Sequence, residues 1–104
     1  MLEKNVVASI RKSIKNKYPQ SQVNKIHGGQ YQSAGISDLL CCIEGRYVAI
    51  EVKTPKTEKN LSVLQKEFID NVVKAGGIAF MASSATMALD KLENALQGKD
   101  YTKY

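Results

Sequence analysis

The feature that most constrains the fold is a pair of apolar, β-branched runs at 39–43 and 47–53 with Glu44-Gly45 between them. Runs of this length and composition are typical of β-strands, and glycine in a short connection is typical of a hairpin turn. Successive side chains alternate between the two faces of a strand, so the second run divides into two rows. We expect the core-facing row to be Val48, Ile50 and Val52, and the opposite row to be Tyr47, Ala49, Glu51 and Lys53. The sequence therefore predicts an antiparallel hairpin.

Ionisable residues lie where this predicted hairpin opens. Asp38 ends the segment Gly35-Ile-Ser-Asp38 just before the first run, and Glu51-Val-Lys53 ends the second. A turn at Glu44-Gly45 places Asp38 across from Glu51, with Lys53 on the same face as Glu51. Two neighbouring carboxylates are tolerable when a divalent cation lies between them, and oxygen ligands favour Mg²⁺ or Mn²⁺. Taken singly, these residues have plainer interpretations as a solvated Glu-Lys pair and a turn-capping aspartate. Together they predict a metal site with Lys53 facing a phosphate or a water.

The segment before the hairpin predicts a helix and a short strand. Apolar residues recur every four positions near the N-terminus, which indicates an amphipathic helix that ends near Tyr18-Pro19. Its expected buried residues are Leu2, Val6, Ile10 and Ile14, with Val7 beside them. Residues 22–27 predict a short strand, and the glycines and polar residues from Gly28 to Gly35 predict a loop that leads into the hairpin.

The segment after the hairpin predicts two further helices around one strand. Thr54-Pro55 ends the hairpin, and a polar loop runs through Asn60. The apolar stripe of the next helix is expected to be Leu61, Leu64, Phe68, Val72 and Ala75, with Gly76-Gly77 as its stop. Residues 78–82 predict a buried strand. Ser84 is expected to cap a last helix, ended by Gly98, whose core residues are Ala88, Leu89, Leu92 and Leu96.

The order of these elements predicts the fold class. Helix, three strands, helix, strand and helix make an α/β protein with an αβββαβα core, in which helices flank a mixed central sheet. At 104 residues the chain is expected to form a single domain over 1–104. The ionisable residues fall on the strands that are expected to be central.

The net charge of +5 is concentrated in the first 37 residues. That segment holds six basic residues against Glu3 alone, whereas the other 67 residues hold nine basic and nine acidic ones. A local basic surface predicts a polyanion such as nucleic acid as partner, and a solvated helix face is the plainer alternative. The six basic residues are Lys4, Arg11, Lys12, Lys15, Lys17 and Lys25.

Composition narrows the remaining classes. The chain is 43% hydrophobic and 24% charged, which is typical of a folded globular protein. No apolar stretch approaches the roughly 20 residues of a membrane span, and the N-terminus lacks a signal-peptide core, so we expect a cytoplasmic protein without a membrane partner. Cys41 and Cys42 are neighbours in a predicted strand and should point to opposite faces as reduced packing residues.

The ordered motifs resemble the PD-(D/E)XK nuclease superfamily and, within it, the small stand-alone VRR-NUC domains of phages and bacteria. Asp38 matches the first half-motif, with Ser37 in place of the usual proline, and Glu51 and Lys53 match the second half. The resemblance covers nearly the whole chain. It implies a restriction-endonuclease-like fold and a cytoplasmic setting in a bacterium or a phage-infected host cell.

The resemblance also implies site residues and chemistry. Gln65 falls where the family places a glutamine that organises the site, which gives a catalytic set of Asp38, Glu51, Lys53 and Gln65. Glu3 falls where junction-cleaving relatives supply a further metal ligand, although the helix dipole alone also favours an acid there. The implied metal ligands are Glu3, Asp38, Glu51 and the backbone carbonyl of Val52. The implied activity is that of a Mg²⁺- or Mn²⁺-dependent endodeoxyribonuclease.

The substrate is expected to be branched or duplex DNA. The candidate nucleic-acid contacts are Lys4, Arg11, Lys15, Lys25, Lys56 and His27, and His27 has a structural role as its alternative. A two-fold homodimer would match a four-way Holliday junction, and the second helix, the last helix, Tyr101 and Tyr104 are candidate dimer surfaces. Two alternatives stay open: a nuclease for flaps, nicks or duplex ends that works with a replication or repair partner, and a non-catalytic DNA-binding module.

Overall fold

The computed structural model describes residues 1–27 and 35–104, and its element order is the predicted αβββαβα. The predicted loop at 28–34 lies outside the described residues. The predicted strand at 22–27 is shorter than expected and ends at Lys25. The elements are α1 (Glu3–Lys17), β1 (Gln22–Lys25), β2 (Leu39–Ile43), β3 (Arg46–Val52), α2 (Val63–Lys74), β4 (Ile78–Ala82) and α3 (Ala85–Leu96).

The strands form one mixed sheet in the order β1-β2-β3-β4. The first three are antiparallel neighbours, whereas β4 pairs parallel to β3 after the α2 crossover. The predicted hairpin is confirmed: Ile43 pairs with Arg46, and both turn residues have positive φ, 50° at Glu44 and 77° at Gly45. Positive φ at both positions is the geometry of a two-residue turn whose twist matches that of the strands. Over residues 1–27 and 35–104 the fold is therefore mixed α/β, a four-stranded sheet flanked by three helices.

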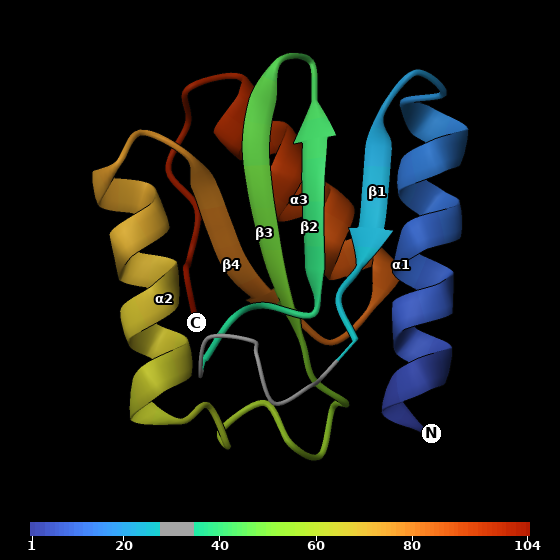
Figure 1. The fold of residues 1–104 in the computed structure, drawn as a ribbon. Coiled ribbons are helices and arrows are strands. Elements are labelled where there is room, and N and C mark those ends of the chain that lie inside the picture. The colour runs from blue at the N-terminus through green and yellow to red at the C-terminus, as the bar shows by residue number, and fades with distance from the viewer. Residues whose placement is uncertain (28–34) are drawn as a thin grey trace.

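Helices cover both faces of the sheet, but unequally. α1 and α3 pack against one face, and α2 lies over β3 and β4 on the other (Figure 1). The predicted row Val48, Ile50 and Val52 is confirmed and belongs to the larger core, with α1 and α3. The opposite face buries a smaller cluster around Ala49, Ile69 and Ala79. Because α2 covers that face, the opposite row of β3 is buried in part rather than fully solvated.

Two predicted helix faces need correction. Leu2 is the N-cap of α1 and is 61% exposed, because its side chain lies before the first helical turn rather than beneath it. In α2 the fully buried residue is Ile69, whereas Leu64 is 50% exposed and Ala75 is also exposed. The helix is rotated so that Ile69, rather than Leu64, points at the sheet. The predicted helix ends near Tyr18 and Gly76-Gly77 are confirmed.

The outer edge of β4 is occupied by the last residues of the described chain (Figure 1). The Ala79 N–H donates to the Tyr101 hydroxyl at 3.3 Å, and the Met81 N–H donates to the Lys103 carbonyl at 2.8 Å. Tyr101 also packs edge-on against Phe80, with ring centroids 5.8 Å apart. These contacts use Tyr101 within the chain, so it is not a free surface for a partner.

The two cysteines lie on opposite faces of β2, as predicted. Cys41 is buried and Cys42 is exposed, and neither forms a disulfide. Burial raises the pKa of the Cys41 thiol to about 12. Among residues 1–27 and 35–104, no helix combines the length and the apolarity that a membrane crossing requires.

Candidate active site

The ionisable residues of the predicted site gather at one end of the sheet. The N-terminal ends of α1 and α2 and the C-terminal end of β3 all lie toward that end (Figure 1). The β2–β3 register pairs Leu39 with Ile50. One residue further along, the same register places Asp38 opposite Glu51. The short two-residue turn sets this register, because a slip by one residue would move every side chain to the other face.

Asp38 joins three strands at this end. One carboxylate oxygen, Oδ2, accepts the Val52 N–H at 2.8 Å, so the side chain continues the β2–β3 ladder beyond the end of β2. The Asp38 backbone carbonyl accepts the Ile26 N–H at 2.8 Å, which extends the pairing with β1. These bonds fix Asp38 against Glu51 across the hairpin. Its neighbour Ser37 is buried, and the Ser37 hydroxyl has no partner among the described residues.

Glu51 is a buried acid with one unsatisfied oxygen. Its side chain lies under α2 and the residue is only 3% exposed. Oε2 accepts the Gln65 side-chain N–H at 3.2 Å, whereas Oε1 has no partner among the described residues. Burial, and then the nearby Asp38 carboxyl, raise the pKa of Glu51 to about 9, against the opposing effect of Lys53. A carboxyl in this setting requires either a proton or a cation.

Gln65 is oriented by the first turn of α2. Ser62 and Gln65 form a capping box, in which the Gln65 N–H donates to Ser62 Oγ at 3.1 Å and the Ser62 N–H donates to Gln65 Oε1 at 2.9 Å. The remaining end of the amide, Nε2, is the group that donates to Glu51. Our sequence interpretation missed Ser62, although Ser-x-x-Gln ahead of an apolar run is a readable capping signature.

Glu3 and Lys53 lie within electrostatic reach of the carboxylate pair. Partial burial and then Asp38 raise the pKa of Glu3, whereas Lys53 and Lys25 lower it. Lys53 is half-buried, and its backbone N–H donates to the Ala82 carbonyl at 3.0 Å, which anchors it beside β4. The Lys53 ammonium also lowers the pKa of Glu51, so it lies near both acids. The cluster therefore contains both acidic and basic groups.

The donor chemistry of the pair suits a hard cation. Asp38 and Glu51 supply carboxylate oxygens, including the unsatisfied Glu51 Oε1, and Mg²⁺ is commonly bound by one or two carboxylates while it retains several waters. Within the described part of the chain, no three His, Cys, Asp or Glu side chains form a ready metal-binding group. The structure thus does not join Glu3 to the pair as a third ligand. The ligand roles of Glu3 and of the Val52 carbonyl stay predictions.

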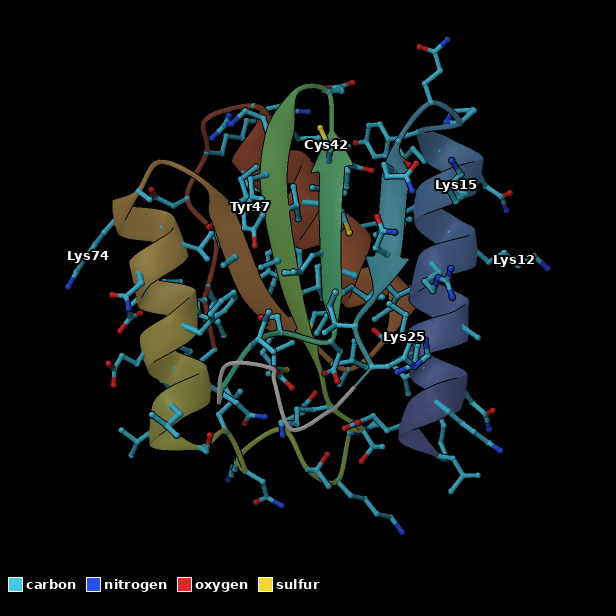
Figure 2. The ribbon with its side chains drawn as sticks, viewed as in Figure 1. Lys12, Lys15, Lys25, Cys42, Tyr47 and Lys74 are labelled. Carbon is cyan, nitrogen blue, oxygen red and sulfur yellow. The ribbon has the colours of Figure 1, made fainter. Side chains whose placement is uncertain are left out.

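Two of the predicted nucleic-acid contacts lie toward opposite ends of the molecule (Figure 2). Lys25 lies toward the end of the sheet that carries the acids, whereas Lys15 lies toward the other end (Figure 2). The Lys15 ammonium donates to the backbone carbonyls of Pro19 and Ser21, at 3.1 and 2.5 Å, so a phosphate would compete with these bonds. The remaining predicted contacts, Lys4, Arg11, Lys56 and His27, are all exposed.

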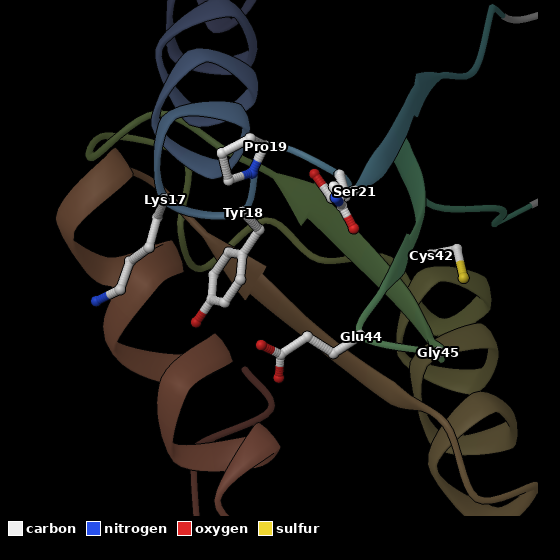
Figure 3. Close-up of a pocket in the computed structure, with 8 residues that line it drawn as sticks. Lys17, Tyr18, Pro19, Ser21, Cys42, Glu44 and Gly45 are labelled. Atoms are coloured by element: carbon white, nitrogen blue, oxygen red, sulfur yellow. The ribbon is translucent and has the colours of Figure 1, made fainter.

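A cavity of about 430 Å³ opens at the hairpin end, away from the carboxylate pair. Tyr18 and Glu44 point toward one another across it (Figure 3). Burial, and then the Glu44 carboxylate, raise the pKa of Tyr18. Ser21 also lines this cavity, and its buried hydroxyl has no partner among the described residues. This cavity lacks the paired acids of the other end, so it and the candidate metal chemistry lie at different ends of the sheet (Figure 1).

Neither a scan against protein-family models nor a search of curated proteins found a match to this chain. The family resemblance therefore rests on the motifs and their order.

Proposed function

We propose that this chain is a Mg²⁺- or Mn²⁺-dependent DNA endonuclease that hydrolyses phosphodiester bonds. The observation that carries the proposal is the pairing of Asp38 with a buried Glu51 that keeps one oxygen unsatisfied, with Lys53 beside them. A buried, unpaired carboxylate is costly unless a proton or a cation compensates it. Perturbed acids clustered with a base are typical of catalytic sites.

Each residue has a defined task in this proposal. Asp38 and Glu51 hold the cation, which supplies electrostatic stabilisation of the phosphate when bound. Lys53 orients the attacking water or the phosphate from the same face of β3. Gln65 holds the Glu51 carboxylate in place through its 3.2 Å hydrogen bond.

The proposed substrate is branched DNA, in particular a four-way junction that a homodimer cuts. Lysines on α1 and near the site, with Arg11, would contact phosphates, which position a nucleic acid without specifying its sequence. Recognition by shape is therefore the natural mode for a domain of this size. Two sites related by a two-fold axis would suit the paired strands of a junction.

The exposed side of α2 supports a second copy of this chain as partner. Tyr47 is 48% exposed beside a groove of about 290 Å³, and Leu64 extends the apolar surface along the helix. The exposed charges next to this stripe include one acid, Glu67, and one base, Lys74. Antiparallel packing of two α2 helices would place Glu67 of each copy near Lys74 of the other, whereas DNA would favour a wholly basic surface. The groove is lined by Tyr47, Phe68, Asn71, Val72, Ala75 and Gly77.

Sedimentation of the purified protein tests the dimer. Tyr47→Glu should shift it to monomer, because the added charge lies in the apolar groove. Asn16→Glu is the matched control, since it adds the same charge on the exposed side of α1. A monomeric wild-type protein at micromolar concentration would overturn the dimer.

The activity test compares a labelled four-way junction, a flap and a linear duplex of equal length with Mg²⁺, Mn²⁺ or EDTA. Symmetric paired nicks in the junction, lost in EDTA and in Asp38→Asn, are the expected result. Asp90→Asn is the control, because it makes the same change at an exposed position of α3. Cleavage of the flap or the duplex instead would reassign the substrate. Binding without cleavage, unchanged in Lys53→Ala, would favour a non-catalytic module.

A further inference from the structure

The first turn of α2 contacts Glu51 and also the chain segment that leads into Asp38. Gln65 donates to Glu51 from this turn. Gly35, three residues before Asp38, packs against the same turn: a Cβ at Gly35 would lie 2.4 Å from the Leu64 carbonyl oxygen. That distance leaves no room for any side chain, so the backbones are in direct contact. The position of this turn therefore bears on both carboxylates.

The capping box determines which end of the Gln65 amide faces Glu51. A side-chain amide carries one acceptor oxygen and one donor nitrogen on a planar group. The Ser62 N–H requires an acceptor, so Oε1 is directed to it at 2.9 Å, and Nε2 is then left to donate to Glu51 at 3.2 Å. The Ser62 hydroxyl closes the box by accepting the Gln65 N–H at 3.1 Å. The hydroxyl does not touch the side-chain amide: it holds the Gln65 backbone so that Oε1 stays within reach of the Ser62 N–H, and its loss loosens that first turn while the Ser62 N–H itself remains.

We propose that Ser62 is a positioning residue, which acts through Gln65 to hold the Glu51 carboxylate in its metal-binding orientation. This inference rests on the proposed function for its consequence in catalysis, but its structural content does not depend on cleavage. Outer partners that orient metal ligands typically change metal affinity or activity by about 10- to 100-fold when they are removed. Ser62 would thus matter for more than the stability of α2.

The chain offers a matched control for this proposal. Ser84 caps α3 by accepting the Met87 N–H at 3.1 Å, which is the distance of the Ser62 bond, and both helices are 12 residues long. Ser62→Ala and Ser84→Ala therefore remove the same kind of bond from helices of equal length. Only Ser62 is connected to Glu51. Ser62→Thr keeps a capping hydroxyl and serves as the conservative rescue.

Calorimetric titration with Mn²⁺ is the first measurement. Ser62→Ala should weaken Mn²⁺ binding about tenfold, as Gln65→Ala should, whereas Ser84→Ala and Ser62→Thr should stay close to the wild type. Because both residues act along one path, Ser62→Ala combined with Gln65→Ala should bind Mn²⁺ no more weakly than Gln65→Ala alone. Equal Mn²⁺ affinities for Ser62→Ala and Ser84→Ala, or additive losses in the double variant, would overturn the proposal.

A second measurement in metal-free protein separates this proposal from the proposed function. The NMR signals of the Gln65 side-chain amide should shift in Ser62→Ala and in Glu51→Gln, and should be unchanged in Ser84→Ala. If the wild-type protein neither binds Mn²⁺ nor cuts DNA, the nuclease proposal fails, and the amide signals alone decide whether Ser62 orients Gln65. Unchanged signals in Ser62→Ala would overturn that role.

Discussion

The two ends of the sheet each bury an oxygen that has no hydrogen-bond partner among the described residues. At the hairpin end it is the Ser21 hydroxyl, beside a cavity of about 430 Å³. The other end likewise buries a serine hydroxyl, that of Ser37, and in addition Glu51 Oε1. A buried neutral hydroxyl without a partner costs about 1–3 kcal/mol. A buried carboxylate oxygen beside a second acid costs far more and needs a compensating charge. The candidate site is therefore identified by the chemistry of its buried oxygens rather than by the presence of a cavity.

The largest expected effect is on the cleavage rate, which should respond to a substitution at the carboxylate end of the sheet and not at the hairpin end. Glu51→Gln should lower the cleavage rate by roughly a thousandfold, because it removes a charge that helps to hold the cation in the transition state. Glu44→Gln makes the same change at the exposed hairpin turn and should leave the rate within about twofold. Single-turnover cleavage of a labelled junction measures both. Equal losses in the two variants would remove the distinction between the ends.

The alternation of β3 and the Glu44-Gly45 turn could be predicted from the sequence, because a period of two and a two-residue connection leave one register. They bring Asp38 opposite Glu51 without any knowledge of the helices. The burial of Glu51 could not be predicted in the same way, because it depends on which side of α2 faces the sheet. Apolar residues lie on two overlapping stripes of α2, one through Leu64 and one through Ile69, and only packing against β3 and β4 selects between them.

The contacts that join Ser62 to Glu51 through Gln65 could likewise be predicted only in part from the sequence. The capping box is local and could be predicted from four residues. The hydrogen bond from Gln65 to Glu51 joins residues 14 apart in sequence and needs the three-dimensional approach of α2 to β3. Local chemistry is thus readable in the chain, whereas the contacts that tune the site come from tertiary packing.

The second expected effect concerns stability against pH in EDTA. Burial raises the pKa of Glu51 to about 9 in the folded chain, from an ordinary value of 4.5. Between these values the folded state holds a proton that the unfolded state has released, so the free energy of unfolding falls as pH rises, by up to roughly 1.4 kcal/mol per pH unit from this group. The stabilisation is complete below about pH 4.5 and lost above about pH 9. Urea unfolding at pH 5, 7 and 9 measures it.

The control for this effect is again a matched pair. Glu51→Gln should flatten the fall in stability with pH, because the amide does not titrate. Glu44→Gln should retain the wild-type slope, because Glu44 is exposed at the turn. A wild-type slope in Glu51→Gln would show that the carboxyl ionises in the folded chain as readily as it does in water.

The third expected effect tests the unpaired hydroxyl at the hairpin end. Ser21→Ala should leave the free energy of unfolding unchanged or raise it by up to about 1 kcal/mol, because it removes a buried hydroxyl without a partner. Ser37→Ala makes the same change beside Asp38 and should behave alike. Urea unfolding at one pH gives both values. A loss of more than about 1 kcal/mol in either variant would show that the hydroxyl is hydrogen-bonded in solution.

The smallest expected effect concerns DNA affinity at the two ends. Lys25 lies close enough to the acids to lower the pKa of Glu3, whereas the Lys15 ammonium is bonded to the carbonyls of Pro19 and Ser21. Lys25→Gln should weaken junction binding severalfold and reduce the salt slope by about one, because one phosphate contact is lost. Lys15→Gln should leave the binding affinity and the salt slope unchanged, because the Lys15 ammonium already donates to backbone carbonyls at the end of α1. Binding titrations from low to moderate salt, with Asp38→Asn to prevent cleavage, measure the two slopes. If Lys15→Gln had the larger effect, DNA would bind along the hairpin end, and the assignment of Lys25 as the phosphate contact beside the carboxylates would fail.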